Sequence, residues 1–252
     1  LESGSVSLIR NKSQITKQVK PSAVLSVCFC GAYLVAGLKE GSLVVLRLES
    51  LEKVKEVPAH KGQVTCLKKL SETAFISGST DQLVKVWSLE NLECVSLKGH
   101  TDSVNCVDVL GNFAVSGSSD KTLIVWKVDQ NTSTTLKGHL RKVNAVVLQS
   151  KKFCFSGGED FCVCVWSVQD RILLTRIETS YTVSSLALSG DKLTLVIGTR
   201  YGLLFELKNP LNVENTVSIL PNRHSGVFLN YIKQTLQGRV TTFQSVFKDF
   251  VV

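Results

Sequence analysis

Short apolar runs alternate with turn residues along most of the chain, in an order that returns every 39 or 40 residues. One copy reads "SVNCVDVL", then "FAVSG", then "LIVWKV", with Gly, Ser, Asp and Asn between the runs. Runs of this length bounded by turn residues are typical of β-strands, and no stretch has the apolar periodicity of an amphipathic helix. The pattern therefore predicts an all-β protein made of repeats with about four strands each.

Three full copies of the repeat each end on a tryptophan. They run from His60 to Trp87, from His100 to Trp126 and from His139 to Trp166. Degenerate copies extend the array in both directions, and all except the N-terminal one keep the glycine that precedes the tryptophan position by nine residues. They are marked by Gly37 and Leu46, by Gly198 and Leu207, and by "GSVSLI" at residues 4–9, and a weak seventh copy is marked by Gly238 and Phe247. Self-similarity at a fixed period indicates a repeat architecture.

A histidine near the start of each full copy and a tryptophan near its end resemble the WD-repeat β-propeller family. The resemblance extends over about residues 20–208. It departs from the family pattern at Ser88, Lys127 and Ser167, which follow the three tryptophans where the family's name-giving aspartate stands. The resemblance implies an all-β fold, a propeller of four-stranded antiparallel blades.

The repeat marks also predict the extent of the propeller. We expect a single β-propeller domain over residues 1–252, with five complete blades in the firm repeats at about 22–220. Residues 1–20 and 221–252 are expected to form partial or degenerate blades. The marks fit a ring of six or seven blades and slightly favour seven. Because the chain contains no methionine, not even at position 1, we expect a segment of a longer protein.

One stretch of the sequence raises the question of a catalytic Ser–His–Asp set, because it contains His100, Asp102, Ser116, Ser118 and Asp120 within about twenty residues. A nucleophilic site of this kind occurs once in a protein, whereas this pattern occurs three times. The resemblance implies instead that histidine, serine, aspartate and tryptophan form structural hydrogen-bonded tetrads. The three sets are His60-Ser77-Asp81-Trp87, His100-Ser116-Asp120-Trp126 and His139-Ser156-Asp160-Trp166. Their donors and acceptors complement one another, so each polar atom finds a partner.

Enzyme motifs are missing from the sequence, which has no G-x-G-x-x-G, phosphate loop, H-E-x-x-H or G-x-S-x-G. Three of the four histidines belong to the tetrads, and His224 stands alone in "PNRHSG". The sequence therefore predicts a protein that is not an enzyme and has no cofactor and no catalytic metal.

Composition indicates a globular chain, with 44% hydrophobic and 20% charged residues. No apolar run reaches the roughly 18 residues of a membrane span, and the N-terminus lacks a signal-peptide pattern. We expect a cytoplasmic or nuclear protein that is not secreted. The close cysteine pairs, Cys28-x-Cys30 and Cys162-x-Cys164, do not have the spacing of zinc ligands. The eight cysteines are expected to be reduced, buried thiols that act as small apolar residues.

The net charge of +8 raises the possibility of RNA or an anionic membrane as partner. Five lysines fall near the first-to-second-strand turns of the wide face: Lys68, Lys69, Lys151, Lys152 and Lys192. Acidic residues on the same side dilute this arc, and with 7% aromatic residues no base-stacking platform is visible. Nucleic-acid binding is disfavoured, and an RNA- or membrane-binding propeller is kept as the alternative of a different class.

The main hypothesis is a non-catalytic protein–protein interaction scaffold that binds partner proteins or peptides with its loops. Two narrower roles are the substrate-receptor propeller of a ubiquitin ligase and the regulatory propeller of a larger NTPase or trafficking protein. The resemblance places partner binding on the narrow face, at the loop before the first strand and the turn between the second and third. The matching positions are Gln63, Thr65, Thr80, Ser103, Asn105, Ser119, Lys142, Asn144, Glu159, Lys39 and Arg200. Because these are mostly small and neutral, we expect an unphosphorylated partner. The sequence leaves the oligomeric state open.

Overall fold

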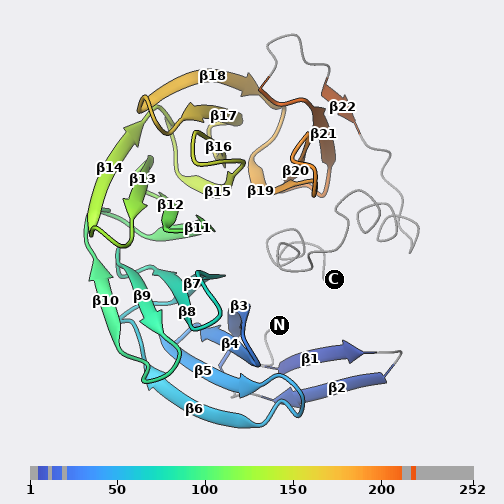
Figure 1. Cartoon of the computed structure of the whole chain (residues 1–252). Coiled ribbons are helices and arrows are strands. Elements are labelled where there is room, and N and C mark those ends of the chain that lie inside the picture. Colours follow the sequence, from blue (N-terminus) through green and yellow to red (C-terminus); the bar gives the residue numbers. More distant parts are fainter. Residues whose placement is uncertain (1–4, 11–12, 19–21, 212–216, 220–252) are drawn as a thin grey trace. The chain divides into compact units, whose positions relative to one another are not determined.

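The computed structural model describes residues 5–10, 13–18, 22–211 and 217–219, drawn as ribbon in Figure 1. All regular elements in this part of the chain are β-strands, so the expected all-β class is confirmed. The described strands form five four-stranded sheets and one two-stranded sheet, each with its strands in chain order. The weak copy around Phe247, and His224, lie outside the described residues.

The chain divides into two compact units, residues 1–120 with 124–134 and residues 121–123 with 135–252. In the first unit, β1 (Ser5–Arg10) pairs with β2 (Ser13–Gln18). Two complete sheets follow in this unit. One contains β3 (Val24–Cys30), β4 (Tyr33–Leu38), β5 (Ser42–Arg47) and β6 (Lys53–Pro58), and the other β7 (Val64–Lys69), β8 (Ala74–Ser79), β9 (Val84–Ser88) and β10 (Cys94–Leu97).

The next sheet contains β11 (Val104–Leu110), β12 (Phe113–Ser118), β13 (Thr122–Lys127) and β14 (Thr132–Lys137). Two sheets belong to the second unit alone. They contain β15 (Val143–Leu148), β16 (Phe153–Gly158), β17 (Cys162–Ser167) and β18 (Ile172–Glu178), and then β19 (Val183–Leu188), β20 (Thr194–Thr199), β21 (Leu204–Lys208) and β22 (Val217–Ile219). Neighbouring strands in both are antiparallel, as in the sheets of the first unit.

Burial follows strand position, which explains the two kinds of apolar run in the sequence. The second strands, such as β8 and β16, are buried at five of their six residues, because both faces are covered. Fourth strands carry polar and charged residues and are mostly exposed, as in β6. Charged outer strands oppose pairing with another chain.

In three sheets, the glycine that marks the repeat (Gly37, Gly78 or Gly157) is required by close packing of the next sheet. A Cβ atom on Gly37 would lie 2.6 Å from Cγ1 of Val64, and one on Gly78 would lie 2.7 Å from Cγ1 of Val104. Each valine is the first residue of the following sheet's first strand. Apolar residues of two consecutive sheets therefore share one core, in which the rings of Phe75 and Trp87 stack with centroids 6.1 Å apart.

All eight cysteines are free in the structure. Five are buried: Cys28, Cys30, Cys154, Cys162 and Cys164. Cys66 and Cys106 are half-buried. The expectation of a buried thiol is wrong for Cys94, which is exposed because it lies on β10, an outer fourth strand.

Candidate protein-interaction face

The predicted tetrad residues meet in the structure. Trp87 Nε1 donates to Ser77 Oγ over 2.8 Å, and the same oxygen lies 2.8 Å from His60 Nε2. His60 Nδ1 lies 2.9 Å from a carboxylate oxygen of Asp81. Asp81 also accepts the backbone N–H groups of Lys61 and Leu83, so one carboxylate holds together the loop before β7 and the β8–β9 turn.

The other two tetrads repeat this geometry. In the second, Ser116 Oγ lies 2.8 Å from both Trp126 Nε1 and His100 Nε2, and His100 Nδ1 lies 2.8 Å from Asp120. In the third, Ser156 Oγ lies 2.7 Å from Trp166 Nε1 and 2.6 Å from His139 Nε2. Asp160 completes it, 3.0 Å from His139 Nδ1.

Burial lowers the pKa of His60, His100 and His139, and this outweighs the opposite effect of the neighbouring aspartates. The rings are therefore neutral near pH 7, with Nδ1–H donating to aspartate and Nε2 accepting from the serine hydroxyl. This order of atoms is the same as in a serine hydrolase. Here, however, the three serines are fully buried, and each oxygen also accepts a tryptophan N–H, which leaves no room for a substrate carbonyl.

The polar loop positions predicted for the narrow face are brought together in pairs. In each sheet a backbone N–H of the turn between the second and third strands donates to a carbonyl of the loop before the first strand. The pairs are Lys39–Ala23 (2.9 Å), Thr80–Gln63 (3.1 Å), Ser119–Ser103 (2.9 Å), Glu159–Lys142 (3.0 Å) and Arg200–Thr182 (3.1 Å). The side chains of Lys142 and Glu159 also form an ion pair of 2.9 Å. The two segments thus form one bonded surface element at the end of each sheet.

Nine of the eleven predicted positions are half-buried, and only Lys39 and Arg200 are exposed. Thr65, Asn105 and Asn144 lie at a β-bulge that recurs in the first strand of every four-stranded sheet. Thr65 Oγ1 donates to the carbonyl of Val104, and Asn144 Nδ2 donates to the carbonyl of Val183 over 2.8 Å. Thr65 and Asn144 thus bond the following sheet, and partner binding at these positions stays a prediction.

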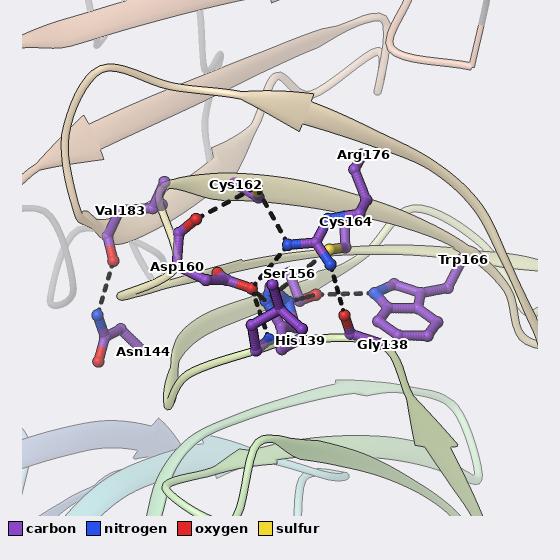
Figure 2. A network of polar contacts seen from close by, with 11 residues as sticks. Gly138, His139, Asn144, Ser156, Asp160, Cys162, Cys164, Trp166, Arg176 and Val183 are labelled. Atoms are coloured by element: carbon purple, nitrogen blue, oxygen red, sulfur yellow. Dashed lines mark hydrogen bonds and ion pairs between the residues drawn. The ribbon is translucent and has the colours of Figure 1, made fainter.

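The third tetrad carries an additional arginine that the sequence reasoning missed (Figure 2). Arg176 on β18 donates to the carbonyl of Gly138 over 2.7 Å and to Asp160 Oδ2 over 3.1 Å. The same guanidinium lies 3.4 Å from Cys162 Sγ. The signal that could have revealed it is the β17–β18 register, which places Arg176 opposite Cys164.

Four apolar residues were also missed at these loops, namely Leu140, Phe161, Tyr181 and Tyr201. Leu140, Phe161 and Tyr201 are exposed, and the rings of Tyr181 and Tyr201 meet edge to face at 5.5 Å. The available signal was an apolar residue at a turn position that is polar or glycine in other repeats, such as Gln82 or Gly41.

The lysines of the wide face are partly neutralised in the structure. Lys68 pairs with Asp108 at 3.3 Å, and Lys69 pairs with Glu72. Lys192 donates to the carbonyl of Gln149. Lys151 and Lys152 are exposed on the β15–β16 turn.

A family model described as "WD domain, G-beta repeat" matches residues 51–88, 92–127 and 130–167. The chain is a WD-repeat protein. Each matched segment begins with the fourth strand of one sheet and ends with the third strand of the next, so the WD repeat is offset from the sheet by one strand. A crystal structure of RRP9 WD40 repeats is similar with a TM-score of 0.76 and 21% identity, covering 87% of this chain and 74% of that chain. The WD40 β-propeller fold expected from the sequence is thereby confirmed.

Two curated proteins are similar over shorter segments. Mitochondrial division protein 1 of Phaeosphaeria nodorum is 38% identical over 64 residues, which are 25% of this chain and 9% of that protein. Cell division control protein 4 of Saccharomyces cerevisiae is 28% identical over 90 residues, 35% of this chain and 12% of that protein. The chain thus spans about a tenth of the length of the curated relatives it matches. Within the described residues, no helix is long and apolar enough to cross a membrane.

Proposed function

We propose that this WD-repeat chain is a non-catalytic scaffold that binds an unphosphorylated segment of a partner protein with the loops before the first strands and the turns between the second and third strands of its sheets. One observation carries the proposal: the tetrads use their catalytic-type side chains internally and hold the loops in place. Asp81, for example, bonds its histidine and two loop N–H groups at once. A rigid framework that presents loops is the arrangement by which many folds bind partners.

The pairing of wide-face lysines with carboxylates supports a protein partner over RNA or an anionic membrane. Lys68 and Lys69 are paired with carboxylates, and their charge is offset locally. Counterion release, which drives binding to polyanions, needs lysines and arginines without such partners. An RNA- or membrane-binding role therefore stays the less favoured alternative.

The two curated relatives are named for mitochondrial division and for cell division control, which supports a regulatory role. The narrower roles of a ubiquitin-ligase substrate receptor, or of a regulatory propeller in a larger NTPase or trafficking protein, stay predictions. We further propose a cytoplasmic or nuclear location, supported by eight free cysteines, because disulfides are rare in those compartments. A single propeller domain of six or seven blades stays a prediction.

The proposal is tested by capturing partners from cell extract on the intact chain and identifying them by mass spectrometry. Lys39→Glu and Arg200→Glu change exposed loop positions, whereas Lys152→Glu changes an exposed lysine on the β15–β16 turn. We expect a partner whose binding falls with the loop variants, persists with Lys152→Glu and is unchanged by phosphatase treatment. The proposal is contradicted if the chain binds RNA or anionic vesicles, if Lys152→Glu weakens this binding and if the binding falls steeply with salt.

A further inference from the structure

Within the second unit, four loop segments lie in a continuous row. Leu140 N–H donates to Asp160 Oδ2 over 2.9 Å, and Phe161 follows Asp160. The carbonyl of Phe161 accepts from Thr179 N–H over 2.7 Å, and Thr179 Oγ1 donates to the carbonyl of Tyr181 over 2.8 Å. Through these bonds the row reaches Tyr181 and its edge-to-face partner Tyr201.

This row presents an apolar surface, the aromatic ledge, made of Leu140, Phe161, Tyr181 and Tyr201. The exposed fraction is 67% for Leu140, 49% for Phe161 and 73% for Tyr201. Tyr181 is half-buried, since it packs on the core beneath and supports Tyr201. Exposed aromatic side chains of this kind are enriched at the energetic centres of protein interfaces.

Phe161 lies at a turn position whose backbone is in the left-handed region, with a φ of 57°. At the matching turn position the other four-stranded sheets have Gly41, Gln82, Lys121 and Gly202, all with positive φ, so only the large apolar side chain is particular to Phe161. A bulky residue in this conformation is strained, and glycine is not. Because the other sheets form this turn with glycine or a polar residue, the fold does not require an exposed phenylalanine here.

Tyr201 lies in a sheet where the repeat pattern is broken. It occupies the turn position of the tetrad aspartates, equivalent to Asp160, in a sheet that has Ile197 in place of the tetrad serine. No tetrad forms there, and the side chain projects into solvent instead of bonding the loop.

The charge around the ledge is positive once internal pairs are set aside. Lys142 pairs with Glu159, and Arg176 pairs with Asp160. Arg141 and Arg200, which lie on the same four loops, are exposed and form no ion pair with the described residues. Glu178, at the end of β18, is the exposed carboxylate next to this row. The two arginines complement a carboxylate beside an apolar anchor.

We propose that the aromatic ledge binds a short linear peptide of a partner protein that carries an aromatic or leucine anchor next to an acidic residue. The anchor packs on Phe161 and Tyr201, and the acidic side chain pairs with Arg141 or Arg200. This inference rests on the proposed scaffold function and adds to it the location and the chemistry of the ligand.

The test selects peptides from a random phage-displayed library on the intact chain and measures the affinity of the selected peptide by fluorescence anisotropy. We expect an apolar–acidic consensus whose Kd rises at least about tenfold with Phe161→Gly, and similarly with Arg141→Glu combined with Arg200→Glu. Gln82→Gly changes the same turn position in another sheet and is the matched control, together with Ile172→Ala, an exposed apolar residue on β18. Both controls are expected to leave Kd within about twofold of the wild-type value.

Folding is checked separately, because Phe161→Gly replaces a strained residue by one suited to positive φ. Its thermal midpoint is expected to equal or exceed that of the wild type, so lost binding is not lost structure. The proposed peptide site is contradicted if the selected peptides bind Phe161→Gly as tightly as the wild type. It is also contradicted if they lack the apolar–acidic pair. If such peptides instead lose affinity with Lys39→Glu, the loop-face function stands and only this inference fails. If neither peptides nor extract proteins bind, both fail.

Discussion

Arg176 and Asp160 form an ion pair within the third tetrad, with Nη2 3.1 Å from Oδ2. Asp160 is almost completely buried and already bonds His139 and the N–H of Leu140. The guanidinium bridges this carboxylate to the carbonyl of Gly138. It therefore joins β18 to the loop that begins the aromatic ledge.

Removing this arginine should destabilise the chain. Arg176→Ala leaves a buried carboxylate with one charged partner fewer and is expected to lower the free energy of unfolding by about 1.5–3 kcal/mol. Arg176→Lys keeps the charge but not the two-point contact and should lose part of this amount. Urea unfolding measures both. Arg47→Ala, which changes an exposed arginine on β5, should stay within about 0.5 kcal/mol.

Arg176→Ala should also raise the pKa of His139, since the positive charge of Arg176 contributes to lowering that pKa. NMR titration of the histidine ring protons gives this pKa directly. A loss of stability with an unchanged His139 pKa would contradict the electrostatic part of the account.

The tetrads should make stability depend on pH. Burial lowers the pKa of all three histidines in the folded chain, whereas in the unfolded chain they titrate near 6.5. Below that pH the histidines of the unfolded chain bind protons, whereas those of the folded chain stay neutral. The contribution of the three histidines to the free energy of unfolding is therefore complete above about pH 6.5. It declines as the pH falls toward their pKa values in the folded chain.

This dependence is measured as the free energy of unfolding in urea between about pH 5.5 and 7.5, the range in which histidine titrates. Replacing His100 by Gln removes one of three equivalent groups and should reduce the slope by about a third. A slope that is flat in the wild type, or unchanged in this variant, argues for histidines that are charged in the fold.

The hydrogen bond between Trp126 and Ser116 should appear as an energetic coupling. Trp126→Phe keeps most of the ring volume but removes the N–H donor, and Ser116→Ala removes its acceptor. The double mutant is expected to be more stable than the sum of the single losses predicts, by about 1 kcal/mol. Denaturant titration of the four proteins completes the cycle.

Ser118 provides the matched control for this cycle. It is buried two residues from Ser116, but its hydroxyl donates to the carbonyl of Asp102, whereas the indole N–H donates to Ser116. Trp126→Phe and Ser118→Ala should therefore be additive within about 0.5 kcal/mol. Equal couplings at both serines are inconsistent with a specific indole–hydroxyl bond.

The bulge position Thr65 should behave as a structural residue. Thr65→Val removes the donor to the carbonyl of Val104 and is expected to lower the free energy of unfolding by about 1 kcal/mol. Thr65→Arg should lower it further, because the half-buried site has no room for the longer side chain. Thermal and urea unfolding measure the effect. Thr101→Val, at an exposed loop position, should change stability by less than about 0.5 kcal/mol.

The sequence alone determined the class of fold, the repeat and the members of the tetrads. These features depend on local order along the chain: alternating or continuous apolar runs select strands, and turn residues separate them. The spacing of His100, Ser116, Asp120 and Trp126 recurs in two further copies, so its structural role could be read without coordinates. Repetition also gave the reason to reject a catalytic set.

The tertiary structure alone decided which loop residues are free to bind. Thr65 and Asn144 are polar and lie at loop-facing positions, yet each is bonded to the next sheet, and Cys94 is exposed by its place on an outer strand. The loops of Phe161, Tyr181 and Tyr201 are linked only because consecutive sheets bring these loops together. Such contacts join residues tens of positions apart, and they depend on how sheets pack, which the local pattern of a strand does not encode.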